Sequence, residues 1–131
     1  MSEQKELVST WLPRLALIGS GAILCFAGIF GTLNPEIISG SAKLEPDAVT
    51  SIRVDFGGFH LGLGLFALFG AIFGSLTRAS LIAVLTTLLL VVSTRMLGLV
   101  LDGVNETQLT TLAKESIPLA LSTIGLSAYK P

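Results

Sequence analysis

The sequence predicts an all-α integral membrane protein, a bundle of four transmembrane helices with both termini on the same side. Hydrophobic residues make up 51% of the 131 residues and charged residues only 13%, against roughly 25% charged residues in ordinary soluble domains. The mean hydropathy of +0.81 points the same way. Four apolar segments nearly use up the chain, so residues 1–131 are expected to form a single membrane domain.

The first segment, residues 15–33, contains no charged residue. It is longer than the roughly 7–15 apolar residues of a signal peptide, so it is expected to stay as a span. The second and third segments, residues 56–76 and 79–101, are so close in the sequence that they are expected to form an antiparallel pair. At 1.5 Å per residue the third covers roughly 35 Å, enough to cross a hydrocarbon core of about 30 Å.

The fourth segment, residues 109–129, contains Lys114 and Glu115 and is interrupted by Pro118. Its uncharged part is shorter than the roughly 17 residues that a span needs, so three spans with an interfacial tail are the alternative. Residues 34–51 have the Pro, Gly, Ser and Asp content of a loop, with room for a short interfacial helix over residues 44–52.

The distribution of lysine and arginine predicts the orientation. With four spans, the side of the termini carries Lys5, Arg14, Arg78 and Lys130. The opposite side carries Lys43 and Arg53 together with Glu36, Glu45, Asp47, Asp102 and Glu106. This bias favours both termini in the cytoplasm.

Arg95 is the most informative residue, because an arginine at the centre of a transmembrane helix costs about 2.5–3.5 kcal/mol. Such a charge normally faces the interior of a bundle and has a partner. Counted inward from one side, His60, Arg95 and Glu115 fall at about the same depth, in the outer half of the membrane. The expected polar layer consists of Arg53, Asp55, His60, Arg95, Asp102 and Glu115.

Two interpretations of this layer remain open. In the first, ion pairs fix helix order and register, for example Arg95 with Glu115 or Asp102, and Arg53 with Asp55 or Glu115. In the second, the layer binds a small polar or lipid-like molecule, or passes protons through His60.

His60 has two interpretations of its own. It is either a hydrogen-bonded structural residue or an axial ligand of haem or chlorophyll. Helical spacing places Arg53, Gly57, His60 and Gly64 on one face of the second helix. With no second histidine in the chain and no cysteine at the depth of His60, no metal site is expected.

Glycines at small-x-x-x-small spacing let helix backbones approach closely in lipid. The second segment has this spacing at Gly58 and Gly62 and again at Gly70 and Gly74, with Gly57 alongside. These glycines are expected to pack against another helix of the bundle or against another chain.

No enzyme or cofactor is expected. The sequence has neither a glycine-rich loop leading to a Lys-Ser/Thr phosphate site nor a Gly-x-Ser-x-Gly elbow. Cys25, the only cysteine, lies in an apolar segment and is interpreted as a packing residue. The net charge of −1 gives no reason to expect nucleic acid, so the expected partners are the bilayer and another membrane protein or a second copy.

Two motifs carry a family resemblance. Arg53-Val-Asp-Phe-Gly-Gly resembles Arg-x-x-Tyr-Gly-Gly, and Arg95-Met-Leu-Gly-Leu-Val-Leu-Asp-Gly resembles Arg-x-x-Gly-x-x-x-Asp-Gly, of a family of small bacterial four-helix membrane proteins of unknown function. Phe56 stands where that family has tyrosine, and Ser51 where it has an acid. The resemblance implies four helices, a bacterial inner membrane and importance for Arg53, Gly57, Gly58, Arg95, Asp102 and Gly103.

The resemblance implies no activity, so the expected function rests on composition. The chain is expected to be a non-enzymatic accessory or scaffold subunit that packs through its glycines against a larger membrane assembly. The alternative is a binder or carrier of a small polar or lipid-like molecule at the layer of Arg53, His60, Arg95 and Glu115.

Overall fold

A computed structural model of the chain describes residues 2–40 and 44–130, with the backbone alone at residues 2–6. Lys43 and the side chain of Lys5 therefore lie outside the description. Every regular element in the described residues is helical. The elements are α1 (Ser2–Leu33), α2 (Pro35–Ser39), α3 (Pro46–Ile52), the π-helical segment η1 (Arg53–Gly58), α4 (Phe59–Ile72), the 3₁₀ turn η2 (Gly74–Leu76), α5 (Thr77–Asp102) and α6 (Glu106–Ala128).

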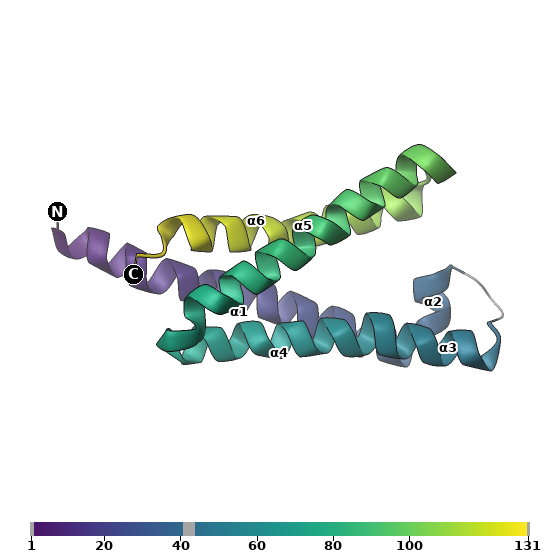
Figure 1. Cartoon of the computed structure of the whole chain (residues 1–131), viewed down its shortest axis with the longest axis horizontal. Helices are drawn as coiled ribbons and strands as arrows, with labels where there is room; N and C mark the ends of the chain where they lie inside the picture. The colour runs from purple at the N-terminus through teal and green to yellow at the C-terminus, as the bar shows by residue number, and fades with distance from the viewer. Residues whose placement is uncertain (1, 41–43, 131) are drawn as a thin grey trace.

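The long helices form an elongated bundle (Figure 1). Helix α1 packs against both α4 and α6, whereas α5 starts beside α4, runs away from it obliquely and packs against α6. The start of α1, the end of α6 and the turn between α4 and α5 lie at one end, here called the terminal end. Helices α2 and α3 and the turn between α5 and α6 lie at the other, the loop end.

The second long helix begins earlier than predicted. Elements α3, η1 and α4 form one continuous stretch, Pro46–Ile72, rather than a helix starting at residue 56. Pro46 occupies the first turn of α3 together with Asp47, and a proline and an acid are both favourable at that position. The stretch ends where Phe73 takes an extended conformation, with φ −95° and ψ 103°.

Within the described part of the chain, three helices are long and apolar enough to cross a membrane: Leu7–Leu33, Pro46–Ile72 and Gly74–Asp102. The prediction of an all-helical chain with long apolar helices is therefore confirmed, and the helices are compatible with a membrane protein. Helix α6 has 23 residues, about 35 Å at 1.5 Å each, but it is too polar to join this group. A fourth span stays a prediction.

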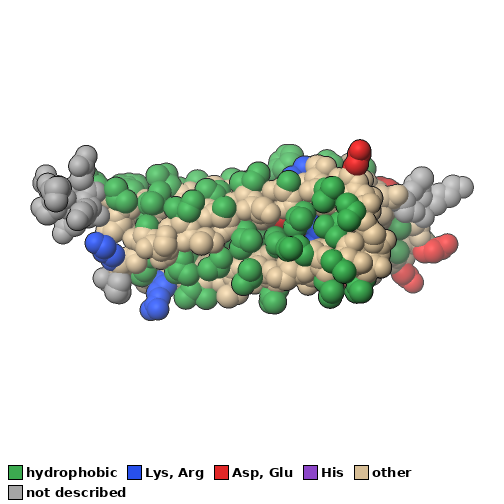
Figure 2. Space-filling view, turned by 90° about the horizontal axis from the view of Figure 1, so that it is seen from above, with side chains coloured by type: hydrophobic (Ala, Val, Ile, Leu, Met, Phe, Trp, Pro, Cys, Tyr) green, Lys and Arg blue, Asp and Glu red, His purple; other side chains and the backbone are tan. Residues whose placement is uncertain are grey.

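The buried hydrophobic core is small, and many large hydrophobic side chains are exposed. Among the described side chains, the fully buried hydrophobic ones are small or medium-sized, while Phe26, Leu90 and Val100 are 72%, 68% and 81% exposed. Hydrophobic side chains are spread along the visible face of the molecule, basic side chains lie towards both ends, and acidic ones gather towards the loop end (Figure 2). Soluble monomers rarely expose apolar surface on this scale, which suits contact with lipid.

Glycines bring α1 and α4 together. A Cβ atom at Gly28 would lie 2.5 Å from the backbone nitrogen of Leu61, and one at Gly64 would lie 2.7 Å from that of Cys25. No side chain fits between backbones at these separations. In lipid the hydrophobic effect does not drive helices together, so this close packing of small residues is what stabilises the contact between α1 and α4.

Candidate binding site

Arg95 on α5 and Glu115 on α6 form a bidentate ion pair. The Arg95 Nε donates to Glu115 Oε2 and its Nη2 donates to Oε1, both at 2.6 Å. Glu115 is 9% exposed, so this charge is held inside the bundle by a partner whose planar fork matches a carboxylate. Of the pairings left open by the sequence, this is the one that the structure contains.

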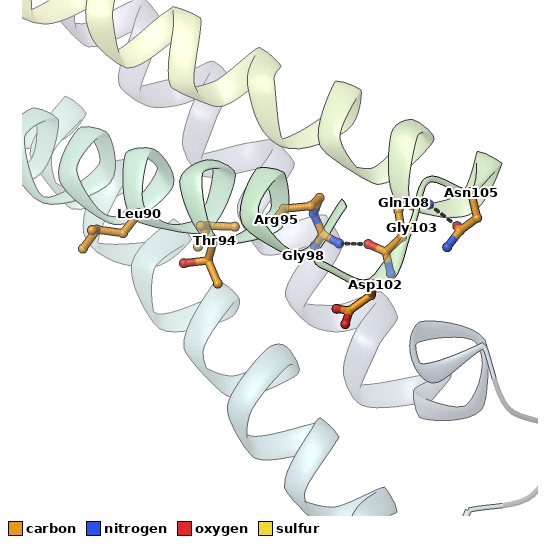
Figure 3. A pocket seen from close by; sticks show the side chains of 9 residues that line it. Leu90, Thr94, Arg95, Gly98, Asp102, Gly103, Asn105 and Gln108 are labelled. Carbon is orange, nitrogen blue, oxygen red and sulfur yellow. Dashed lines mark hydrogen bonds between the residues drawn. The ribbon is translucent and has the colours of Figure 1, made fainter. Parts of the chain in front are cut away.

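The first turn of α6 adds a second residue that accepts a hydrogen bond from Arg95. Gly103 has a φ of +94°, which favours glycine, and the side chain of Asn105 caps α6 by accepting from the Gln108 backbone N–H at 2.9 Å. The Gln108 side chain then accepts a hydrogen bond from Arg95 Nη1 (Figure 3). Sequence reasoning missed Gln108, although its position seven residues before Glu115 places both on one helical face.

The other charged members of the predicted layer lie apart from this pair. Arg53 is exposed and donates from Nε to the Thr32 carbonyl at 3.1 Å, which satisfies a carbonyl at the end of α1. Asp55 and Asp102 are exposed, and neither forms a hydrogen bond or ion pair with any described residue. Asp102 lies near Arg95 without bonding to it (Figure 3).

His60 is oriented by two contacts with Phe56. Its Nδ1 lies 2.7 Å from the Phe56 carbonyl, and because a carbonyl can only accept, Nδ1 carries the proton. The imidazole also stacks on the Phe56 ring with centroids 4.1 Å apart, and it meets Phe59 edge-on. The second nitrogen, Nε2, has no hydrogen-bond partner among the described residues.

Two cavities adjoin the ion pair. The first, here called the loop-end recess, has a volume of about 460 Å³ and lies along α5 and the start of α6. Arg95, Asp102 and Gln108 line it (Figure 3). The second, here called the inter-helix cleft, has a volume of about 480 Å³ and lies between α1, α2, η1, α4, α5 and α6. Arg95 lines the recess and Glu115 lines the cleft, so the ion pair lies between the two.

The inter-helix cleft is apolar with a few polar groups. Its polar lining residues are His60, Thr111, Lys114 and Glu115. The remaining lining residues are Ile23, Leu24, Phe26, Ala27, Phe30, Ile38, Phe56, Leu88, Ile117 and Pro118. Phe26 and Ile117 are 72% and 54% exposed, so the cleft opens on the long side of the molecule.

The glycines predicted to pack have different surroundings. Gly57 and Gly70 are buried, and a Cβ atom on them would overlap Thr32 and Ser80 respectively. Gly74 lies beside the Arg14 guanidinium. A Cβ atom at Gly58 would meet only the Arg53 carbonyl oxygen, at 3.8 Å, and one at Gly62 would meet no described atom within 4 Å.

No cluster of three or more His, Cys, Asp or Glu side chains that could hold a metal ion occurs in residues 2–40 and 44–130. A role of His60 as an axial ligand stays a prediction.

The comparisons with known proteins give a family without an activity. The model of one family, described as a domain of unknown function (DUF4345), matches residues 12–122. No curated protein and no solved structure matches the chain. The match includes the ion pair, His60 and every lining residue of both cavities.

Proposed function

Since the chain belongs to the DUF4345 family, a domain of unknown function, we propose from its site that it is an integral membrane protein that binds a small, largely apolar molecule. The inter-helix cleft carries this proposal. Its volume of about 480 Å³ falls in the range of roughly 300–1,000 Å³ that ligand sites occupy, and such sites are mainly apolar with a few placed polar groups. The proposal is of a binding protein and not of an enzyme.

A purely structural role accounts for only part of the site. An ion pair that fixes helix register would explain Arg95, Glu115 and Gln108. It would not explain His60, whose ring is held by Phe56 with one nitrogen left unpaired. A cleft of about 480 Å³ that opens on the side of the bundle beside such a group supports an occupant.

The test is to block the cleft. Ala27 lines it, and Ala22 is exposed on the same helix outside it. We expect protein extracted in mild detergent to carry a discrete extra mass in native mass spectrometry, to lose it in Ala27→Phe and to keep it in Ala22→Phe. Wild-type protein without an extra mass, or equal retention in both variants, would contradict the proposal.

We also propose four spans with both termini on the cytoplasmic side of a bacterial inner membrane. The position of both chain ends and of the start of α5, which carries Arg78, at the terminal end supports this topology. In a Cys25→Ala background, Ser127→Cys should resist an impermeant maleimide in intact cells while Asn105→Cys reacts. The reverse pattern, or equal labelling, would contradict the topology.

A second candidate is the accessory subunit expected from the sequence. The open surroundings of Gly58 at the end of η1 and of Gly62 on α4 support it, because glycines whose Cβ would meet no described side chain within 4 Å leave a flat surface for another helix. Gly62→Leu should then release the protein from a larger complex on native gels, whereas Ala120→Leu, on the exposed face of α6, should not. Unchanged migration of both variants would remove this candidate.

A further inference from the structure

The polar residues that line the inter-helix cleft offer mainly hydrogen-bond acceptors. His60 uses its Nδ1–H on the Phe56 carbonyl, which leaves Nε2 of the neutral ring as an acceptor. The hydroxyl of Thr111 donates to the Thr107 carbonyl at 2.9 Å, so its oxygen is free only to accept. The carboxylate of Glu115 has no proton to give while it is paired with Arg95.

Lys114 is the exception among the lining residues. It is exposed, and a lysine in this position keeps its ammonium in a polar surrounding while its stem lies along apolar surface. An anionic head group could pair with Lys114, but deeper in the cleft it would meet the Glu115 carboxylate and the His60 lone pair. A cationic head group would meet Lys114 itself as a like charge.

We infer that the cleft binds an uncharged amphiphile whose polar end is a hydroxyl group, an apolar alcohol or phenol that donates its hydrogen bond to His60 Nε2. The apolar body of such a molecule would lie among residues such as Leu24, Phe56 and Leu88, which line the same space. A hydroxyl also matches the scarcity of polar groups, because one donor satisfies the one unpaired ring nitrogen. This inference rests on the proposed binding function.

Three matched probes separate the possible head groups. 4-Octylphenol donates a hydrogen bond, 4-octylanisole has the same body but no donor, and 4-octylbenzoate is an anion. Each is titrated into protein in lipid nanodiscs, and one-to-one adducts are counted by native mass spectrometry. We expect the phenol to bind roughly tenfold more tightly than the ether, and the benzoate to bind no better than the ether.

Variants assign that preference to the histidine. His60→Leu should bind phenol and ether equally, while Thr86→Val, which changes an exposed threonine outside the cleft, should keep the preference. Because the wild-type comparison of the probes needs no mutation, a folding defect in His60→Leu does not weaken the test. A phenol preference that survives in folded His60→Leu would overturn the inference.

The outcomes also distinguish the inferred hydroxyl donor from the proposed binding function. Equal binding of phenol and ether, abolished by Ala27→Phe, would leave the cleft as a binding site and overturn the hydroxyl donor. Preference for the benzoate would overturn it in favour of an anion held by Lys114. Binding unaffected by Ala27→Phe would overturn both the inference and the proposed function, whereas binding of no probe by protein that carries the extra mass would overturn the inference alone.

Discussion

The terminal and loop halves of the bundle hold polar atoms in opposite ways. Towards the terminal end, neutral hydroxyls bond to backbone: Thr77 donates to the Gly70 carbonyl at 2.7 Å and Ser80 to that of Phe66 at 3.1 Å. Towards the loop end, α5 and α6 are joined by Arg95 and Glu115 through long side chains. Short hydroxyls and glycines let helices close on one another, whereas a charged pair keeps two helices apart and leaves cavities beside it.

The largest expected effect is on the charged half. Arg95→Leu leaves Glu115 buried without its partner and should lower the free energy of unfolding by about 3–5 kcal/mol. Arg95→Leu combined with Glu115→Leu should lose much less, because removing a buried pair whole can be neutral. Reversible unfolding with sodium dodecyl sulfate in mixed micelles measures both. Equal losses in the single and double variants would show that the pair does not act as a unit.

An intermediate effect is expected at a glycine contact in the terminal half. A Cβ atom at Gly70 would overlap the Ser80 side chain, so Gly70→Ala should destabilise by about 1–3 kcal/mol through overpacking. Gly62→Ala on the same helix meets open space and should be neutral or stabilising by up to about 1 kcal/mol. The same unfolding assay compares them, and similar losses in both would mean that contact with α5 does not limit residue size.

The smallest effect is expected from a single neutral hydrogen bond. The Oγ atoms of Ser20 on α1 and Ser122 on α6 lie 3.3 Å apart. The Ser122 hydroxyl also donates to the Pro118 carbonyl at 2.8 Å. Ser122→Ala should therefore cost about 0.6 kcal/mol, the average for such bonds between membrane helices. Thr123→Ala, which changes an exposed threonine bonded within its own helix, should cost less. If Ser122→Ala lowered the free energy of unfolding by more than about 2 kcal/mol, the neutral hydrogen bonds of one half would matter as much as the ion pair of the other.

The depth of a residue along its helix could be predicted from the sequence better than the direction in which its side chain points around the helix axis. Depth depends only on the rise per residue, so counting residues was enough to place Arg95 and Glu115 at one level, where the structure pairs them. Gln108 could have been found by the same helical spacing. Long apolar segments likewise predicted helices, although the polar start of the stretch Pro46–Ile72 carried no hydropathy signal.

The predicted direction of side chains around the helix was wrong where the α-helix becomes a π-helix. The expectation that Arg53 shares a face with His60 assumed 3.6 residues per turn throughout. The π-helical segment Arg53–Gly58 is wound more widely, and one extra residue changes the direction of a side chain by about 100°. Arg53 lies at the end of α1, bonded to Thr32, while His60 lines the cleft. Nothing in the residue types of this segment marks it as π-helical.

The exposed flanks of the cleft, Phe26 and Ile117, determine how a ligand would arrive. In the proposed bilayer these side chains would face acyl chains, so a hydrophobic ligand would enter sideways from the lipid without passing through water. Occupancy would then follow the mole fraction of the ligand in the membrane rather than its aqueous concentration. A site with modest intrinsic affinity would fill whenever the ligand is a common minor component of the surrounding lipid.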